Sequence, residues 1–338
     1  MESRRAFIKK AASISICLAT RPWSGLLQQR QGSIYTVNGS IRPAQMGFCL
    51  THEHVMSNFG GEMALDPAYD QKKLLDQVLP YLKKIKAIGC DTLVDCTTAY
   101  FGRDVRLLQQ LSTQSGLQIM TNTGYYGAAS DRYVPEHAYQ EDAESIAARW
   151  LDEWKNGIQD SSIFPGFIKV AVDGGNISAI DAKLFRAAAQ THRQSGLTIA
   201  CHTGNNPEAA RQELEILREE GVSPQAWIWT HANQSESVAP LLEAAKAGGW
   251  ISLDGVRENS VDQHLAYLQD LKKAGYLEQV LLSHDGNSFP RGGAIRPYDT
   301  IFTTFLPLMQ KSGFSQKEIR QLTELNPRNA FTVRVRKV

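Results

Sequence analysis

The sequence lacks any run of 18 or more apolar residues, so it gives no reason to predict a membrane-spanning helix. It also lacks an excess of charge, because 36 Lys and Arg stand against 35 Asp and Glu. A balanced chain without a long basic run gives no reason to propose a nucleic-acid partner. What is present, 42% hydrophobic and 21% charged residues, is typical of an ordinary globular protein.

Cysteine is also scarce, with five in 338 residues. Cys17 lies in a distinct N-terminal segment, whereas Cys49, Cys90, Cys96 and Cys201 lie in or beside apolar, strand-like runs. We interpret these four as small buried hydrophobes rather than as disulfide partners or metal ligands.

The first thirty residues differ from the rest of the chain. SRRAFIKK (3–10) is followed by the mildly apolar AASISICLAT (11–20) and then by Arg21-Pro22. A basic stretch before a short apolar stretch predicts a secretory signal, and the arginine pair resembles the twin-arginine export signal. We therefore assign residues 1–30 to this signal and expect a periplasmic or otherwise exported protein, a basic N-terminal tail being the alternative. Removing residues 1–30 leaves 30 basic and 34 acidic residues, a net charge of −4.

Residues 31–338 contain no linker or change of composition and are predicted to form a single domain. Asn38-Gly39, between two β-prone runs, predicts an N-terminal β-hairpin with a type I′ turn. Eight β-prone runs then alternate with helical patterns, which predicts a (β/α)₈ TIM barrel, a closed α/β fold. No G-x-G-x-x-G follows the first strand, which disfavours the alternative, an open doubly wound sheet. The predicted strands are 47–50, 91–97, 118–124, 166–172, 197–203, 226–232, 250–255 and 279–285, and the predicted helices are 71–89, 104–116, 141–157, 181–196, 208–221, 238–249 and 262–275.

Active sites of such barrels form at the carboxyl ends of the strands. Residues at positions i and i+2 of a strand share a face, so the two histidines of LTHEHV (50–55) could bind one metal ion together. Four imidazoles, one lysine and one carboxylate suit one or two divalent metals. Six potential ligands lie in or at the ends of the predicted strands: His52, His54, Lys169, His202, His231 and Asp285.

Each of these residues has an alternative interpretation. A single histidine at a strand end is more often hydrogen-bonded than metal-bound, and an aspartate there often caps the next helix. Lys169 should face the barrel interior, where a buried ammonium is costly and tends to lose its proton. A neutral amine could form a Schiff base with a carbonyl substrate, or a carbamate with carbon dioxide. The surrounding histidines favour the carbamate.

Taken together, these motifs resemble the phosphotriesterase family of the amidohydrolase superfamily over about residues Ile34 to Phe331. The resemblance rests on GFCLTHEHV (47–55), GFIKVAVD (166–173), IACHTG (199–204), IWTHAN (228–233), LLSHDGN (281–287) and LNPRNAF (325–331).

The resemblance implies a site with two divalent metal ions, with Zn expected and Co or Mn as alternatives. His52, His54 and Asp285 would hold the buried metal, and His202 and His231 the exposed one. N6-carboxylated Lys169 and a hydroxide would bridge the two ions. The hydroxide would attack a lactone, carboxylic ester or phosphoester. A homodimer is expected because it is usual among similar proteins.

The resemblance also assigns roles to three residues around the metals. Asp285 would take the hydroxide proton, and Asp254 would help to carry it outward. Tyr126 corresponds to a tyrosine that lactone-cleaving members place beside the exposed metal. Two other functions stay open: a metal-independent barrel lyase that uses Lys169 as a Schiff base, and a non-catalytic periplasmic binding protein with a metal site.

The sequence departs from the family pattern at two places. Asn233 and Gln234 stand where the family usually has an aspartate, which puts the proton relay in doubt. Gly255 stands where relatives often carry Arg or His. The loop at residues 283–297 should form another wall of the pocket, and Arg291 and Arg296 in it either meet an anionic substrate or are solvated. We expect no metal at the four remaining histidines: His137, His192, His264 and His284.

Overall fold

The computed structural model describes residues 30–338, so the predicted export signal lies almost wholly outside the described residues. The predicted N-terminal hairpin is confirmed: β1 (Ile34–Thr36) pairs antiparallel with β2 (Gly39–Ile41). The predicted type I′ turn at Asn38-Gly39 is wrong, because Thr36 pairs with Gly39 and Asn38 does not have a positive φ. Val37 is buried and donates its N–H to Ile119, which places the turn at Val37 and Asn38 instead.

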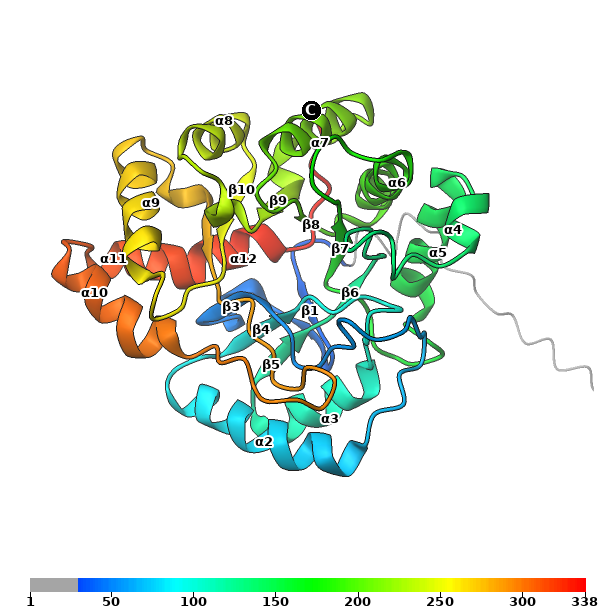
Figure 1. The fold of residues 1–338 in the computed structure, drawn as a ribbon, viewed down its shortest axis with the longest axis horizontal. Helices are drawn as coiled ribbons and strands as arrows, with labels where there is room; N and C mark the ends of the chain where they lie inside the picture. The colour runs from blue at the N-terminus through cyan, green and yellow to red at the C-terminus, as the bar shows by residue number, and fades with distance from the viewer. Residues whose placement is uncertain (1–29) are drawn as a thin grey trace, which may run out of the picture.

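The eight predicted strands form a parallel barrel in the centre of the molecule, and the helices surround it (Figure 1). The third predicted strand is divided at Thr121 into β5 and β6, and ladders run from β3 to β5 and from β6 to β11. The (β/α)₈ prediction is therefore confirmed. The barrel strands are β3 (Cys49–Glu53), β4 (Thr92–Asp95), β5 (Gln118–Met120), β6 (Asn122–Thr123), β7 (Phe167–Ala171), β8 (Ile199–His202), β9 (Trp227–Thr230), β10 (Trp250–Leu253) and β11 (Val280–Leu282).

The barrel closes between β3 and β11 through side chains and single backbone contacts. Asp285 N–H donates to the His52 carbonyl at 3.0 Å, and His52 N–H donates to Ser283 Oγ at 2.9 Å. On the outer side, the buried Glu53 carboxylate accepts from Ser283 Oγ at 2.8 Å and from the Gly286 N–H at 2.6 Å. His284 donates both its N–H, at 2.9 Å, and its Nδ1–H, at 2.8 Å, to Glu53 Oε1. We call Glu53, Ser283, His284 and Gly286 the seam cluster; as predicted, His284 points away from the barrel interior.

Several outer helices begin directly after an aspartate that caps their N-terminus. Asp70, Asp104 and Asp142 each accept a backbone N–H from the first turn of the helix that follows, which satisfies a donor that has no partner within the helix. The helices are α2 (Gln71–Ala87), α3 (Val105–Ser115), α4 (His137–Gln140), α5 (Ala143–Asn156), α6 (Ala179–Ser195), α7 (Pro207–Glu219), α8 (Ala239–Ala247), α9 (Val261–Lys273), α10 (Leu306–Lys311), α11 (Gln316–Arg320) and α12 (Asn326–Phe331). The sequence analysis missed α10 to α12, and placed His137 in a loop although it begins the four-residue α4.

The interior of the barrel is apolar at one end and polar at the other. Cys49, Val94, Met120 and Phe167 belong to one buried cluster at the apolar end. Cys90 and Cys201 are also buried, and all four cysteines in the described chain are free thiols, as predicted. No helix among residues 30–338 is long and apolar enough to cross a membrane.

Candidate metal centre

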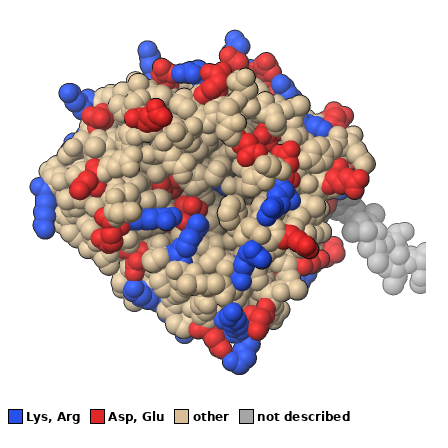
Figure 2. All heavy atoms as spheres, viewed as in Figure 1, with Lys and Arg blue, Asp and Glu red and all other residues tan. Residues whose placement is uncertain are grey.

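Five of the six predicted ligands line one cavity of about 310 Å³ at the carboxyl ends of the strands, namely His52, His54, His202, His231 and Asp285, whereas Lys169 does not line it. The pairing of β3 with β4 shifts register between Leu50 and Glu53, and such a bulge re-aims side chains. His52 therefore faces the interior although Cys49, three residues earlier, also packs there. Figure 2 shows a hollow near the middle of this face of the molecule. The cavity is lined by His52, His54, Ser57, Phe59, Phe101, Tyr126, His202, His231, Asp285, Asn287, Pro290 and Arg296.

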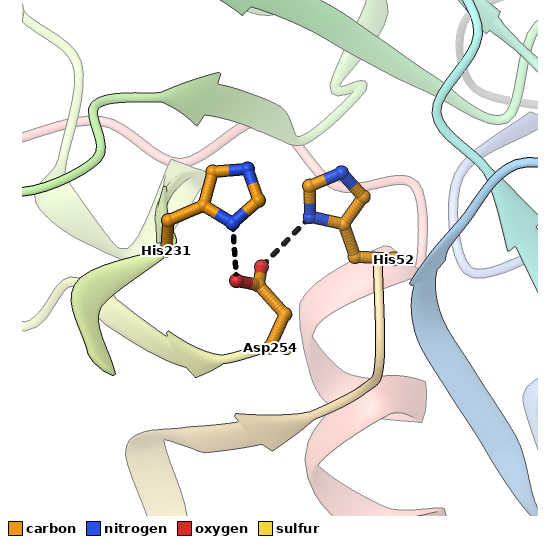
Figure 3. Close-up of side chains that lie close together, drawn as sticks. All are labelled: His52, His231 and Asp254. Carbon is orange, nitrogen blue, oxygen red and sulfur yellow. Dashed lines mark hydrogen bonds and ion pairs between the residues drawn. The ribbon is translucent and has the colours of Figure 1, made fainter. Parts of the chain in front are cut away.

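Asp254, directly after β10, holds two of the histidines (Figure 3). Its Oδ2 lies 2.7 Å from His52 Nδ1, and its Oδ1 lies 2.6 Å from His231 Nδ1. These separations are direct contacts and leave no room for a cation between carboxylate and rings. A carboxylate only accepts, so both Nδ1 atoms carry the proton and both Nε2 atoms keep a free lone pair. Asp254 thus fixes the tautomer that metal binding at Nε2 needs.

His54 and Asp285 form a second convergence beside His52. His54 Nδ1 lies 2.8 Å from Thr97 Oγ1, which leaves its Nε2 directed at Asp285. Asp285 Oδ1 lies 3.3 Å from His54 Nε2 and 3.7 Å from His52 Nε2. Three potential ligand atoms from the first and last strands therefore face one another, as the resemblance implies for the more buried metal.

His202, the last residue of β8, lies beside His231, with ring centroids 4.4 Å apart. Its Nδ1 lies 3.2 Å from the Tyr126 hydroxyl, so the tyrosine contacts one of the two histidines that the resemblance assigns to the more exposed metal. Tyr126 is fully stacked on Phe101, with ring centroids 4.8 Å apart and planes at 10°. Sequence reasoning placed Tyr126 here but missed Phe101, which lies in a loop without periodicity.

Lys169, in the middle of β7, is completely buried. Its Nζ has one hydrogen-bond partner among the described residues, Thr230 Oγ1 at 3.3 Å, and no carboxylate within 4.0 Å. Thr230 Oγ1 itself donates to the Cys201 carbonyl. Lys169 therefore lies inside the barrel without an acidic partner among the described residues.

Burial holds two of the cavity histidines neutral, whereas at His231 burial is outweighed by the adjacent Asp254 carboxylate, which raises the pKa. Burial, together with the neighbouring Lys169 ammonium, lowers the pKa of His52 to about 3. Burial and the neighbouring His231 lower the pKa of His202 well below its usual value. Burial also opposes a charge on Asp254, but His231 and His52 outweigh it and hold the pKa of Asp254 well below its usual value. Neutral imidazoles beside an ionised carboxylate are the forms that ligate metals.

Two ligands lie just beyond their strands in left-handed backbone. His231 follows β9 with φ +63°, and Asp285 follows β11 with φ +51°. Such backbone is uncommon for residues other than glycine and concentrates at functional sites. The sequence analysis placed both residues inside the strands, because composition does not reveal where a strand turns out of the sheet.

The two departures from the family pattern adjoin each other. Asn233 and Gln234 lie in a 3₁₀ turn, Ala232–Gln234, and neither lines the cavity. Gly255 has φ +94°, and a β-carbon there would lie 3.4 Å from Asn233 Nδ2. Arg296 lines the cavity, whereas Arg291 does not and donates to the Gly60 carbonyl at 3.0 Å.

Comparisons with known proteins agree with this geometry. The chain is 27% identical over 292 residues to a phosphotriesterase homology protein of Escherichia coli, covering 84% of this chain and 98% of that one. It is 25% identical over 347 residues to an N-acetyltaurine hydrolase of Tetraodon nigroviridis, covering 89% and 98%. A solved organophosphorus hydrolase variant from Deinococcus radiodurans superposes with a TM-score of 0.80 at 28% identity, covering 88% and 97%. The model of the phosphotriesterase family matches residues 32–331, and the chain belongs to that family.

Proposed function

We propose that this protein is a binuclear metal-dependent hydrolase that cleaves a carboxylic ester or lactone. The observation that carries the proposal is the convergence of unprotonated ligand atoms on one cavity. His52 and His54 each have Nδ1 occupied by another side chain, so their Nε2 atoms remain for a cation together with Asp285. Asp254 and Thr97 supply the outer contacts that fix these rings.

The donor set fits two divalent cations with nitrogen and oxygen ligands, and we propose Zn, with Co or Mn as alternatives. His52, His54 and Asp285 would hold one ion and His202 and His231 the other. N6-carboxylated Lys169 would be shared between them. Such ions lower the pKa of bound water and polarise a carbonyl or phosphoryl oxygen of a substrate. The sparse surroundings of Lys169 Nζ support carboxylation, because the amine must first lose its proton.

Two side chains have further proposed roles at the reacting atoms. Asp285 is the carboxylate that faces the cavity, and we propose that Oδ1 accepts the proton of the attacking water. Asp254 is completely buried and both of its oxygens contact histidines, so we propose that it positions ligands. Its role in carrying the proton outward stays a prediction.

Amide cleavage is a second candidate. One relative is named an N-acetyltaurine hydrolase. Attack on an amide carbonyl would use the same two metal ions and the same base, Asp285. Phosphoester cleavage is supported in turn by the likeness to an organophosphorus hydrolase. An assay panel must therefore include substrates with each of these cleavable bonds: carboxylic ester, lactone, amide and phosphoester.

The two other functions make different predictions. A Schiff-base lyase would be insensitive to chelators and would be trapped on Lys169 by borohydride with a carbonyl substrate. A non-catalytic binding protein would hold metal and turn over nothing. Twin-arginine export and a homodimer stay predictions.

The test combines elemental analysis of purified protein with a panel of lactones, aryl esters, amides and phosphotriesters. We expect about two metal ions per chain and chelator-sensitive turnover. Lys169→Ala should lose metal and most activity, and added acetate or propionate should restore part of both by replacing the missing carboxylate. Lys83→Ala, an exposed lysine on α2, is the matched control. Full activity and metal content in Lys169→Ala would contradict the proposal.

A further inference from the structure

Arg296 gives the cavity an uneven charge. Among the residues that line the cavity, Asp285 is the only carboxylate and Arg296 is the only permanently charged cation. Asp285 belongs to the metal ligands, so its charge is not reserved for the arginine. An anion in the cavity would therefore meet a guanidinium whose one nearby carboxylate, Asp285 at 3.6 Å, is shared with His52 and His54.

The backbone holds Arg296 at this position. The N–H of Arg296 donates to the Asn287 carbonyl at 2.8 Å, and the N–H of Asn287 donates back at 2.9 Å. Gly286 lies against this pair, because a β-carbon there would come within 2.9 Å of the Arg296 carbonyl oxygen. Asn287 is in turn bridged to His54. Arg296 is thus anchored to the strand end that carries two metal ligands, and is not on a free loop.

The guanidinium is only partly satisfied. Nη2 donates to the Asp285 carbonyl oxygen at 2.8 Å and lies 3.6 Å from Asp285 Oδ1. No described residue accepts from Nε or Nη1. Two other arginines have close acid partners: the buried Arg103 lies 2.6 Å from Glu153, and Arg149 lies 2.5 Å from Glu141. Arg296 therefore has donors left for a ligand, in a side chain that is 44% exposed.

Another part of the cavity wall is apolar. Phe101 stacks on Tyr126 and meets the edge of Phe59 with ring centroids 5.8 Å apart. The cavity, at about 310 Å³, is at the small end of the range for ligand sites. It suits a compact molecule with one apolar part and one charged part.

We propose that Arg296 binds an anionic group of the substrate, so that the protein hydrolyses small acyl compounds that carry one carboxylate, sulfonate or phosphate. Because Arg296 contacts Asp285, the anionic group lies only a few atoms from the scissile bond. Guanidinium pairs with such groups through two donors, which fixes orientation as well as position. This inference rests on the proposed hydrolase function and names its substrate class.

The test uses metal-loaded protein and four acetyl esters, with acetate release as the assay. Three are anionic, the O-acetyl derivatives of glycolate, 2-hydroxyethanesulfonate and 2-hydroxyethyl phosphate, and 2-methoxyethyl acetate is the neutral counterpart. We expect Arg296→Met to lower kcat/KM about 10- to 100-fold for the best anionic ester, mainly through KM, and to leave the neutral ester nearly unchanged. Arg296→Lys should restore part of the loss. The three anions differ in geometry, so their ranking identifies the group.

Arg291→Met is the matched control, because Arg291 is on the same loop but does not line the cavity. Equal losses for neutral and anionic esters in Arg296→Met would overturn the proposal and assign Arg296 to holding Asp285. If none of these esters is cleaved, the hydrolase proposal is judged by its own panel of lactones, aryl esters, amides and phosphotriesters. The inference is then tested by binding alone. Ligand-observed NMR compares the affinity for 4-oxopentanoate, which carries a carboxylate, with the affinity for 2-pentanone, a neutral ketone of similar size. A preference for the anion that Arg296→Met removes supports the inference, and equal binding refutes it.

Discussion

Two buried carboxylate–histidine clusters lie at the carboxyl ends of the barrel strands. The seam cluster joins the end of β3 to that of β11, and the second cluster joins His52 of β3 to His231 and Asp254, which follow β9 and β10. In the seam cluster, His284 donates from Nδ1 to Glu53, and its Nε2 accepts the N–H of Ile301 at 3.0 Å. Both ring nitrogens are therefore used inside the protein. In the cluster of His52, His231 and Asp254, only the Nδ1 atoms are used.

This difference separates the histidines that we propose as metal ligands from a buried histidine that is satisfied within the protein. Burial and a carboxylate partner are common to both clusters, so neither feature distinguishes them. The distinguishing feature is the second ring nitrogen, which is paired in His284 and faces the cavity in His52 and His231. The seam cluster should therefore contribute to stability, and the Asp254 cluster to metal affinity.

The largest expected effect is on the seam. Glu53→Gln would present an amide N–H₂ to the Gly286 N–H or to His284, so that donor would face donor at a completely buried site. Loss of a buried hydrogen bond to a charged acceptor, with a donor left unpaired, costs about 3 kcal/mol. We expect the free energy of unfolding of the apoprotein in urea to fall by that amount, while the folded variant still binds metal. Glu62→Gln, at an exposed site, should change it by less than about 0.5 kcal/mol. Unchanged stability would remove the distinction between the clusters.

The next effect is on the Asp254 cluster. Asp254→Asn keeps one acceptor but turns the other atom into a donor, which forces one histidine to move its proton to Nε2. Outer contacts of this kind are worth about 10- to 100-fold in metal affinity or activity. We expect weaker zinc binding by that factor in competition with a chelator, with little change in unfolding of the apoprotein. Asp262→Asn, exposed on α9, is the control; equal zinc affinities in the two variants would contradict the assignment.

The smallest effect concerns a buried carboxyl without any histidine. Glu213 on α7 contacts Thr203 Oγ1 at 3.0 Å and Cys201 Sγ at 3.2 Å, and burial raises its pKa to about 8 from 4.5. Because the folded pKa is the higher one, this carboxyl costs the fold nothing below pH 4.5 and destabilises it progressively as pH rises to about 8.

Glu213→Gln removes the group that titrates. It thereby tests whether a buried carboxyl without a histidine partner destabilises the fold, unlike Glu53 and Asp254, which contact histidines. We expect the variant to gain at least about 1 kcal/mol relative to the parent between pH 5 and pH 8, measured by urea unfolding at both values. Glu215→Gln, exposed on the same helix, should show no such pH-dependent difference. A constant difference for Glu213→Gln would mean that Glu213 is ionised in the fold.

The sequence was sufficient for the barrel and for the convergence of its ligands, because alternation and strand-end position are local patterns. It was not sufficient for the C-terminal helices α10 to α12. The π-helical segment Ile301–Phe305 leads directly into α10, Gln321–Leu325 joins α11 to α12, and α10 and α12 contain Pro307 and Pro327. Wide turns and prolines break the 3.6-residue periodicity on which the prediction depends.

Other features arise only from three-dimensional packing. Phe59 and Phe101 reach the cavity from loops, where an apolar residue carries no periodic signal. The seam cluster joins Glu53 to residues that directly follow β11, at least 230 positions later in the chain, so the sequence around Glu53 does not predict it. The hairpin turn was misplaced for the same reason, since the position of Val37 depends on its contact with Ile119.

The closure of the barrel between its first and last strands has a consequence for biosynthesis. A nascent chain that has not yet released β11 from the ribosome lacks both Asp285 and the groups that Glu53 binds. Such a chain holds an incomplete set of chelating groups and an open barrel. A chain truncated before β11 therefore cannot close the barrel through the contacts of Glu53 with Ser283 and Gly286.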